Sequence, residues 1–193
     1  MIVRLHSPQI GILRSSTGNI GSIERSLQRL GIASCVVGTA AEIGKTDGLI
    51  FPGAGAALPV MNDLKDRCLV EVLRNYSKPF LGICLGMQLL FDTSEEGPAD
   101  CLGIIRGKVV ELPGTVRKPH MGWNRLSTGE YAYFVHSFVC APTDSRVITI
   151  TVQHGIEIVA AVRKENFFGL QWHPEKSGET GDRFLSFFVR LCK

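Results

Sequence analysis

The segment Gly82-Ile83-Cys84-Leu85-Gly86 constrains this chain more than any other part of its sequence. It directly follows the apolar run Pro79-Phe80-Leu81 and leads into the helix-forming residues 87–90. A strand that turns sharply into a helix lifts one side chain out of a crowded turn, and a glycine on each side relieves the steric conflict. That side chain is the thiol of Cys84, beside a helix N-terminus that favours thiolate. The pattern predicts a nucleophilic cysteine between a strand and a helix.

A cysteine taken at random is more often a small buried apolar residue than a nucleophile, and the flanking glycines reverse this preference for Cys84. The six cysteines, at positions 35, 68, 84, 101, 140 and 192, form no C-x-x-C pair and no regular spacing. We therefore expect neither a zinc site nor a disulfide framework, and no metal or cofactor is implied. Reduced thiols in the cytoplasm fit this pattern best.

Alternating strand and helix signals in the first half predict a mostly parallel sheet with helices on both faces. Strands are expected at residues Ile10–Leu13, Ser34–Val37, 49–51 and 80–83. Two helices are expected from apolar residues at helical spacing. The first contains Ile20, Ile23, Leu27 and Leu30 and ends at Gly31. The second is a crossover helix that contains Leu69, Val72, Leu73 and Tyr76.

The second half predicts a partly antiparallel edge. Ile148, Ile150 and Val152 alternate with threonines, as in a half-buried strand, and Gln153-His154-Gly155 is typical of a hairpin turn before a strand at 156–162. A final helix is expected to be capped by Thr180 and to bury one apolar stripe, made of Phe184, Phe187, Phe188 and Leu191. The fold class is thus α/β, as a single domain over residues 1–193.

Charge and hydropathy exclude two classes of partner. The net charge of +3 is too small and too dispersed for nucleic-acid binding. No run of about eighteen apolar residues is present, so a membrane span is not expected, and the N-terminus lacks the sustained apolar segment of an export signal. Partners must therefore be inferred from sites.

His173 is the best candidate among five histidines for the base that a cysteine nucleophile needs. It follows an apolar strand candidate, and Glu175 lies two residues further on, with Pro174 stiffening the turn between them. Separately, His173 is more typical of a structural histidine and Glu175 of a solvated carboxylate. Together with Cys84 they predict a catalytic triad, because the carboxyl ends of parallel strands meet at one edge of a sheet.

An acyl-transfer site also needs N–H donors for an oxyanion. Gly53, Ala54 and Gly55 follow the third strand candidate and are expected to supply them, with the N–H of Leu85 as a second donor. A plain glycine turn is the alternative interpretation of residues 53–55.

The strings Gly82-Ile83-Cys84-Leu85-Gly86-Met87-Gln88 and His173-Pro174-Glu175 resemble the class I, or triad, glutamine amidotransferase family. Members hydrolyse glutamine through a cysteine thioester and pass the ammonia to a synthase. The resemblance implies that Cys84 is the nucleophile, that His173 is the general base and acid, and that Glu175 orients His173. It also implies that Gln88 contacts glutamine, whereas a solvent-exposed amide is the ordinary alternative.

Pro119-His120-Met121-Gly122-Trp123-Asn124 and Tyr133-Phe134-Val135-His136-Ser137-Phe138 resemble, more narrowly, the glutaminase subunits of imidazole glycerol phosphate synthases in histidine biosynthesis. This similarity begins at about Ile10 and implies a heterodimer with a cyclase subunit, with Ser137 and Phe138 near the substrate. Trp123, Asn124 and Lys176 are then expected at the partner interface. A partly buried aromatic and an ordinary surface cation are the alternatives for Trp123 and Lys176, and His120 and His136 are interpreted as structural or interfacial.

Two departures from the family pattern concern the rim of the pocket. Arg14-Ser15-Ser16 stands where an Asp-Tyr-Gly type sequence is common, and Phe138 stands where a tyrosine is usual. Three alternatives stay open. They are a paralogue that supplies ammonia to another synthase, such as one for surface-sugar amidination, a cysteine peptidase or hydratase of similar fold, and a regulatory subunit without activity.

Overall fold

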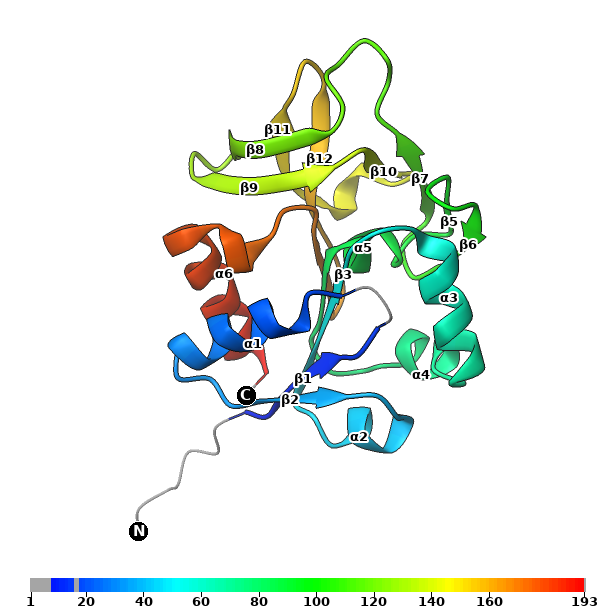
Figure 1. The fold of residues 1–193 in the computed structure, drawn as a ribbon, viewed down its shortest axis with the longest axis vertical. Coiled ribbons are helices and arrows are strands. Elements are labelled where there is room, and N and C mark those ends of the chain that lie inside the picture. Colours follow the sequence, from blue (N-terminus) through cyan, green and yellow to red (C-terminus); the bar gives the residue numbers. More distant parts are fainter. Residues whose placement is uncertain (1–7, 16–17, 193) are drawn as a thin grey trace.

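A seven-stranded sheet with strand order β11-β12-β13-β4-β3-β1-β2 forms the centre of the molecule (Figure 1). The computed structural model describes residues 8–15 and 18–192. All neighbouring strands from β2 to β13 are parallel, whereas β11 and β12 add an antiparallel edge. The strands are β1 (Ile10–Leu13), β2 (Ser34–Val37), β3 (Gly48–Gly53), β4 (Phe80–Cys84), β11 (Ile148–Gln153), β12 (Glu157–Lys164) and β13 (Phe167–Leu170).

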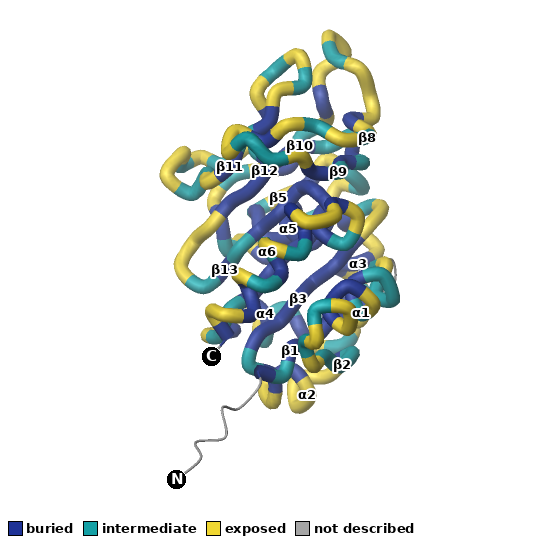
Figure 2. Tube along the Cα trace, turned by 90° about the vertical axis from the view of Figure 1, so that its left-hand side faces the viewer, coloured by how far each residue is buried: buried dark blue, intermediate teal, exposed yellow. Residues whose placement is uncertain are grey.

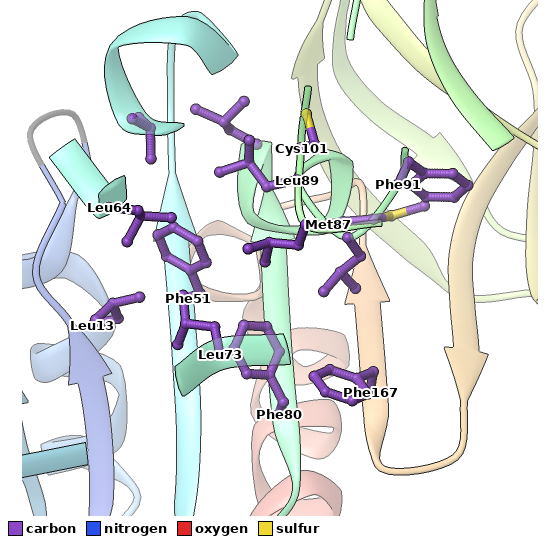
Figure 3. Packing of buried hydrophobic residues seen from close by; sticks show 14 of the residues in the cluster. Leu13, Phe51, Leu64, Leu73, Phe80, Met87, Leu89, Phe91, Cys101 and Phe167 are labelled. Carbon is purple, nitrogen blue, oxygen red and sulfur yellow. The ribbon is translucent and has the colours of Figure 1, made fainter. Parts of the chain in front are cut away.

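Helices cover both faces of this sheet, because its strands alternate apolar side chains between two cores. Ile50 of β3 packs in the core beneath α1 (Ile20–Arg29) and α6 (Gly178–Leu191). Phe51 packs in the other core, beneath α2 (Ala40–Gly44), α3 (Ala57–Asp66) and α4 (Val70–Arg74). Figure 3 shows Phe51 and Phe80 in this second core, and Figure 2 shows the central strands buried and many of the surrounding loops exposed.

Two smaller sheets lie beyond the end of the central sheet at which α5 (Leu85–Gln88) begins (Figure 1). One has the order β10-β7-β5-β6, and the other is the β8–β9 hairpin. Their strands are β5 (Thr93–Ser94), β6 (Ala99–Asp100), β7 (Gly107–Glu111), β8 (His120–Arg125), β9 (Tyr131–His136) and β10 (Phe138–Pro142), and the 3-10 helices are η1 (Ser145–Val147) and η2 (Pro174–Lys176). Within residues 8–15 and 18–192, no helix has the length and apolar character of a membrane span.

The predicted strands at 10–13, 34–37, 49–51 and 80–83 are all present, as are the first helix and the antiparallel hairpin of β11 and β12. Three details differ. The third strand extends to Gly53, so this glycine is part of β3 and not of the following turn. The connection from β3 to β4 holds two helices, α3 and α4, in place of one. The helix after Cys84 is a single turn.

The final helix is correct in position but wrong in its buried face. Gly181 packs against Pro174, where a Cβ would lie 1.8 Å from the carbonyl oxygen, and this close approach sets the rotation of α6. Leu185 and Phe188 therefore face the core, whereas Phe187 and Leu191 are 44% and 37% exposed. Thr180 lies inside the helix and does not cap it, since Ser177 occupies the N-cap position without a side-chain hydrogen bond. The spacing of the apolar residues predicted the helix, but not which of these residues would face the core. The contact between Gly181 and Pro174 determines that.

Candidate active site

Cys84 ends β4 and is the N-cap residue of α5, with φ 53° and ψ −110°. This backbone conformation is unfavourable for a residue with a side chain and costs on the order of 1–3 kcal/mol. The neighbouring glycines explain how the turn is accommodated. A Cβ on Gly82 would lie 2.3 Å from the Gly86 carbonyl oxygen, and one on Gly86 would lie 1.9 Å from that of Phe51. Both glycines are therefore required by close backbone approach, as the sequence pattern predicts.

Gln171 lies beside the Cys84 thiol and was not identified from the sequence. Strand β13 runs parallel to β4 with Leu170 opposite Ile83, so the next residue of each strand falls at the same edge. There Gln171 Nε2 donates to Cys84 Sγ at 3.8 Å. The signal available in the sequence was its position, immediately after a strand and two residues before His173.

His173 and Glu175 form the hydrogen-bonded pair that the sequence suggests. His173 Nδ1 lies 2.8 Å from Glu175 Oε1, and the two side chains are 9% and 3% exposed. The short helix η2 brings the carboxylate back to the ring. The backbone of His173 is itself held, because its N–H donates to the Tyr133 carbonyl at 3.0 Å and its own carbonyl accepts from Ser177 Oγ at 2.6 Å.

Two opposing effects act on the pKa of His173. Burial lowers it, while the interactions with Cys84 and Glu175 raise it, and the net result is a pKa of about 9, above the ordinary value of 6.5. Within the described residues, His173 Nε2 is buried and has no hydrogen-bond partner. Because Nδ1 is engaged by Glu175, Nε2 is the ring nitrogen that can exchange a proton with the thiol.

The segment predicted to supply oxyanion donors runs along the elbow. Gly53 pairs with Cys84, and a Cβ on Gly53 would lie 2.9 Å from the Cβ of Leu85. A glycine at this position therefore allows β3 to approach the turn closely. Ala54 and Gly55 follow, and Gly55 has φ +80°.

Of the Arg14-Ser15-Ser16 departure, Ser16 lies outside the described residues. Ser15 Oγ donates to the Pro52 carbonyl at 3.5 Å, next to the glycine segment.

Gln88 lies near Cys84 and is connected to it by hydrogen bonds through Gln171. Its Nε2 donates to Gln171 Oε1 and to the Phe138 carbonyl, each at 3.2 Å. The side chain is buried, so the alternative of a solvent-exposed amide is wrong. Phe138 contributes its main-chain carbonyl here, while its ring packs against the apolar core. The Ser137 carbonyl accepts a backbone hydrogen bond from the Leu112 N–H at 2.8 Å.

The β8–β9 hairpin separates two sets of side chains by strand alternation. Met121, Trp123 and Tyr131 are 62%, 57% and 56% exposed. The Trp123 ring packs edge-on against Tyr133, and Lys176 Nζ lies 5.6 Å from the Tyr133 ring centroid.

Asn124 behaves differently, because its side chain turns inward to His120 and to the Gln153 carbonyl. Burial is the main cause that lowers the pKa of His120 to about 4 and that of His136 to about 3. Both rings are therefore neutral at physiological pH. The part of the chain that the structure describes contains no cluster of three or more His, Cys, Asp or Glu side chains able to hold a metal ion.

This chain is similar in sequence to known proteins over most of its length. The family model for class I glutamine amidotransferases matches residues 15–191. The imidazole glycerol phosphate synthase subunit HisH of Exiguobacterium sibiricum is 46% identical over 182 residues, which cover 91% of this chain and 92% of that protein. The HisH subunit of Geobacillus thermodenitrificans is 39% identical over 203 residues, covering 94% and 95%.

Solved structures share the fold at lower identity. A crystal structure of a glutamine amidotransferase has a TM-score of 0.78 at 20% identity and covers 95% of this chain and 98% of that one. The PurLQS structure from Thermotoga maritima has a TM-score of 0.71 at 18% identity and covers 97% and 100%. The predicted α/β fold is confirmed, and with the family model spanning the elbow and the His-Pro-Glu string, this chain belongs to the class I glutamine amidotransferases.

Proposed function

We propose that this chain is the glutaminase subunit of an imidazole glycerol phosphate synthase. It hydrolyses glutamine to glutamate and ammonia and delivers the ammonia to a separate cyclase subunit, which makes imidazole glycerol phosphate and aminoimidazole carboxamide ribotide in histidine biosynthesis. The 2.8 Å hydrogen bond between His173 and Glu175 carries the glutaminase assignment, because it leaves Nε2 for proton exchange with Cys84. Relatives named HisH at 39–46% identity support the choice of synthase.

The reaction uses Cys84, His173 and Glu175 as a triad. The Cys84 thiolate attacks the side-chain amide carbon of glutamine, and the tetrahedral intermediate collapses to a thioester as His173 Nε2 protonates the departing ammonia. Water then attacks the thioester, with His173 accepting its proton and returning a proton to the sulfur as glutamate leaves. Glu175 orients the ring through Nδ1 and stabilises the imidazolium.

The remaining predicted site residues are assigned to glutamine binding and to stabilisation of the oxyanion. The peptide N–H groups of residues 53–55 and of Leu85 border the Cys84 elbow and are assigned to the oxyanion. Gln88 and residues 137–138 are assigned to the glutamine pocket, on the evidence that Gln88 and the Phe138 carbonyl connect to the Cys84 sulfur through Gln171.

The partner surface is assigned to the exposed face of the hairpin. Trp123 and Lys176 both lie against Tyr133, next to the loop that carries Glu175, so a subunit docked there would meet the ammonia close to its source. Exposed aromatic side chains of this kind are typical interface anchors. Ammonia that stays out of bulk water is also not protonated, and so keeps its nucleophilicity. A single domain and a cytoplasmic location, with glutamine and the cyclase subunit as partners, complete the proposal.

The decisive experiment compares wild type and Cys84→Ala in the complex reconstituted with the cyclase subunit. Glutamine-dependent synthesis should be lost in Cys84→Ala, while synthesis from added ammonium salt should persist. Loss of both would mean that Cys84 supports the complex structurally. Wild-type complex that cleaves peptides but releases no glutamate from glutamine would favour the peptidase alternative, and glutaminase activity supported only by a different synthase would favour a paralogue.

A further inference from the structure

The inward face of the β8–β9 hairpin carries a hydrogen-bonded chain of side chains that the reaction above does not use. Asn124 Nδ2 lies 3.0 Å from His120 Nε2, and His120 Nδ1 lies 3.0 Å from His136 Nε2. His136 Nδ1 then lies 2.9 Å from the Phe138 carbonyl oxygen, the same atom that accepts from Gln88. The chain therefore runs from the hairpin to the wall of the site.

Both ends of this chain fix the same direction of hydrogen bonding. At one end, Asn124 Oδ1 accepts from the Arg125 N–H and Nδ2 donates to the Gln153 carbonyl, so the amide presents a donor to His120. At the other end, the Phe138 carbonyl can only accept. The network thus assigns the proton to Nδ1 in both His120 and His136, and each Nε2 is an acceptor.

Neutral rings are required for this arrangement. A second proton on either histidine would place two donors face to face, at His120 against Asn124 or at His136 against His120. Burial, which lowers the pKa of both rings, acts in the same sense. The chain consequently has one satisfied pattern of protons, and such fully satisfied networks hold their members rigidly.

From the Phe138 carbonyl the contacts continue to the nucleophile. Gln88 donates to that carbonyl and to Gln171 Oε1, and Gln171 Nε2 donates to Cys84 Sγ. We propose that His120 and His136 are positioning residues of the glutaminase site, which hold the Phe138 carbonyl and thereby fix Gln88, Gln171 and the Cys84 sulfur. This inference rests on the proposed glutaminase function and assigns it two residues that touch neither glutamine nor the thiol.

A packing role is the competing explanation, because His120 also stacks on Phe134 at 4.5 Å and on His154 at 4.2 Å between ring centroids. Two substitutions at position 120 separate these roles. His120→Phe keeps the stacked ring and removes both hydrogen bonds. His120→Asn loses the ring but places an amide N–H near the Nδ1 position, so it can still donate to His136.

We expect His120→Phe to lower kcat for glutamine at least about tenfold in the complex with the cyclase subunit, with a smaller change in KM, since misplacement of reacting groups by fractions of an ångström acts on the chemical step. The rate at which iodoacetamide alkylates Cys84 should fall in parallel. His120→Asn should stay within about threefold of wild type in both measurements. A packing role predicts the opposite order, with the phenylalanine variant the more active.

His154→Phe is the matched control. This ring stacks on His120, but its Nε2 bonds to the Arg117 carbonyl at 2.7 Å, so it is not part of the hydrogen-bonded network from Asn124 to Phe138. Kinetics and Cys84 alkylation should remain at wild-type values in this variant. Equal losses in the variants at positions 120 and 154 would overturn the proposal.

A spectroscopic test avoids substitution altogether. In the chain labelled with 15N-histidine, His120 and His136 should show the Nδ1–H tautomer at neutral pH, whereas His154 should show Nε2–H and serves as the reference. An Nε2–H tautomer at His120 or His136 would refute the proposed direction. Wild type without glutaminase activity would instead contradict the proposed function, independently of these tautomers.

Discussion

Substitution of Gly86 tests the geometry of the elbow directly. A Cβ on Gly86 would lie 1.9 Å from the carbonyl oxygen of Phe51 and 3.0 Å from the carbonyl carbon. Both atoms belong to the backbone of the central strand β3, so no side-chain rotation can relieve the contact. The Cβ would stand about 1.1 Å inside the 3.0 Å below which real Cβ atoms essentially never approach another atom, so strand and elbow must separate by at least about 1 Å.

Gly86→Ala should therefore lower the free energy of unfolding by about 3 kcal/mol, at the upper end of typical overpacking costs. Because a displacement of about 1 Å at the reacting groups costs about a hundredfold, glutaminase activity should fall at least that much. Urea unfolding and glutamate release measure the two effects. Gly114→Ala is the control, since nothing lies within 4 Å of the added Cβ, and it should change stability by less than about 0.5 kcal/mol.

A Gly86→Ala protein that unfolds at the wild-type urea concentration and hydrolyses glutamine normally would refute the close approach of β3 to the elbow. Similar losses at positions 86 and 114 would show that the glycines matter for a general reason, such as chain flexibility, and not for the contact with Phe51. A variant that loses activity but keeps wild-type stability would show that Gly86 affects the active site, and that the predicted overpacking against Phe51 does not occur.

Three further outcomes are expected. The pKa of His173 is about 9 in the folded protein, against an ordinary 6.5. Protonation of His173 therefore adds to the free energy of unfolding in full below pH 6.5, and this contribution is lost as the pH rises through 9. Glu175→Gln should lower this pKa in an NMR titration and flatten the fall in unfolding free energy over that range. Cys84→Gly should be more stable in urea than Cys84→Ala by about 1 kcal/mol, since glycine tolerates φ 53°, and neither should hydrolyse glutamine. Trp123→Ala should weaken binding of the cyclase subunit about thirtyfold in calorimetry, as for an interface anchor, whereas the exposed Arg146→Ala should leave it unchanged.

Local patterns predicted the parts of this molecule that are determined locally. The elbow at Cys84 was recognisable because its two glycines relieve contacts within one turn and with the adjacent strand. The His173–Glu175 pair was recognisable because only Pro174 separates the two residues, in one short loop after a strand. Strands such as β1 and β4 were predicted from continuous apolar runs, which parallel strands buried on both faces require.

Long-range register determined what the sequence did not reveal. Gln171 meets Cys84 across 87 residues, through the pairing of β13 with β4, and its position after a strand does not by itself reveal that contact. Phe138 contacts Gln88 through its main-chain carbonyl, which every residue type has. The presence of phenylalanine where the family usually has tyrosine therefore gave no information about this hydrogen bond. The inward turn of Asn124 likewise depends on the pairing of β8 with β9 and on β11, which supplies the Gln153 carbonyl.

The structure places a different electrostatic partner beside Cys84 than the sequence indicated. A helix N-terminus was expected beside the thiol, but α5 has only four residues, and one turn aligns few peptide dipoles. The interaction that the structure provides is with His173, whose pKa is raised by Cys84 and Glu175 together. This partner belongs to the loop after β13. That loop is bound through the His173 N–H to the Tyr133 carbonyl of the hairpin, so β9 helps to hold the histidine that interacts with Cys84.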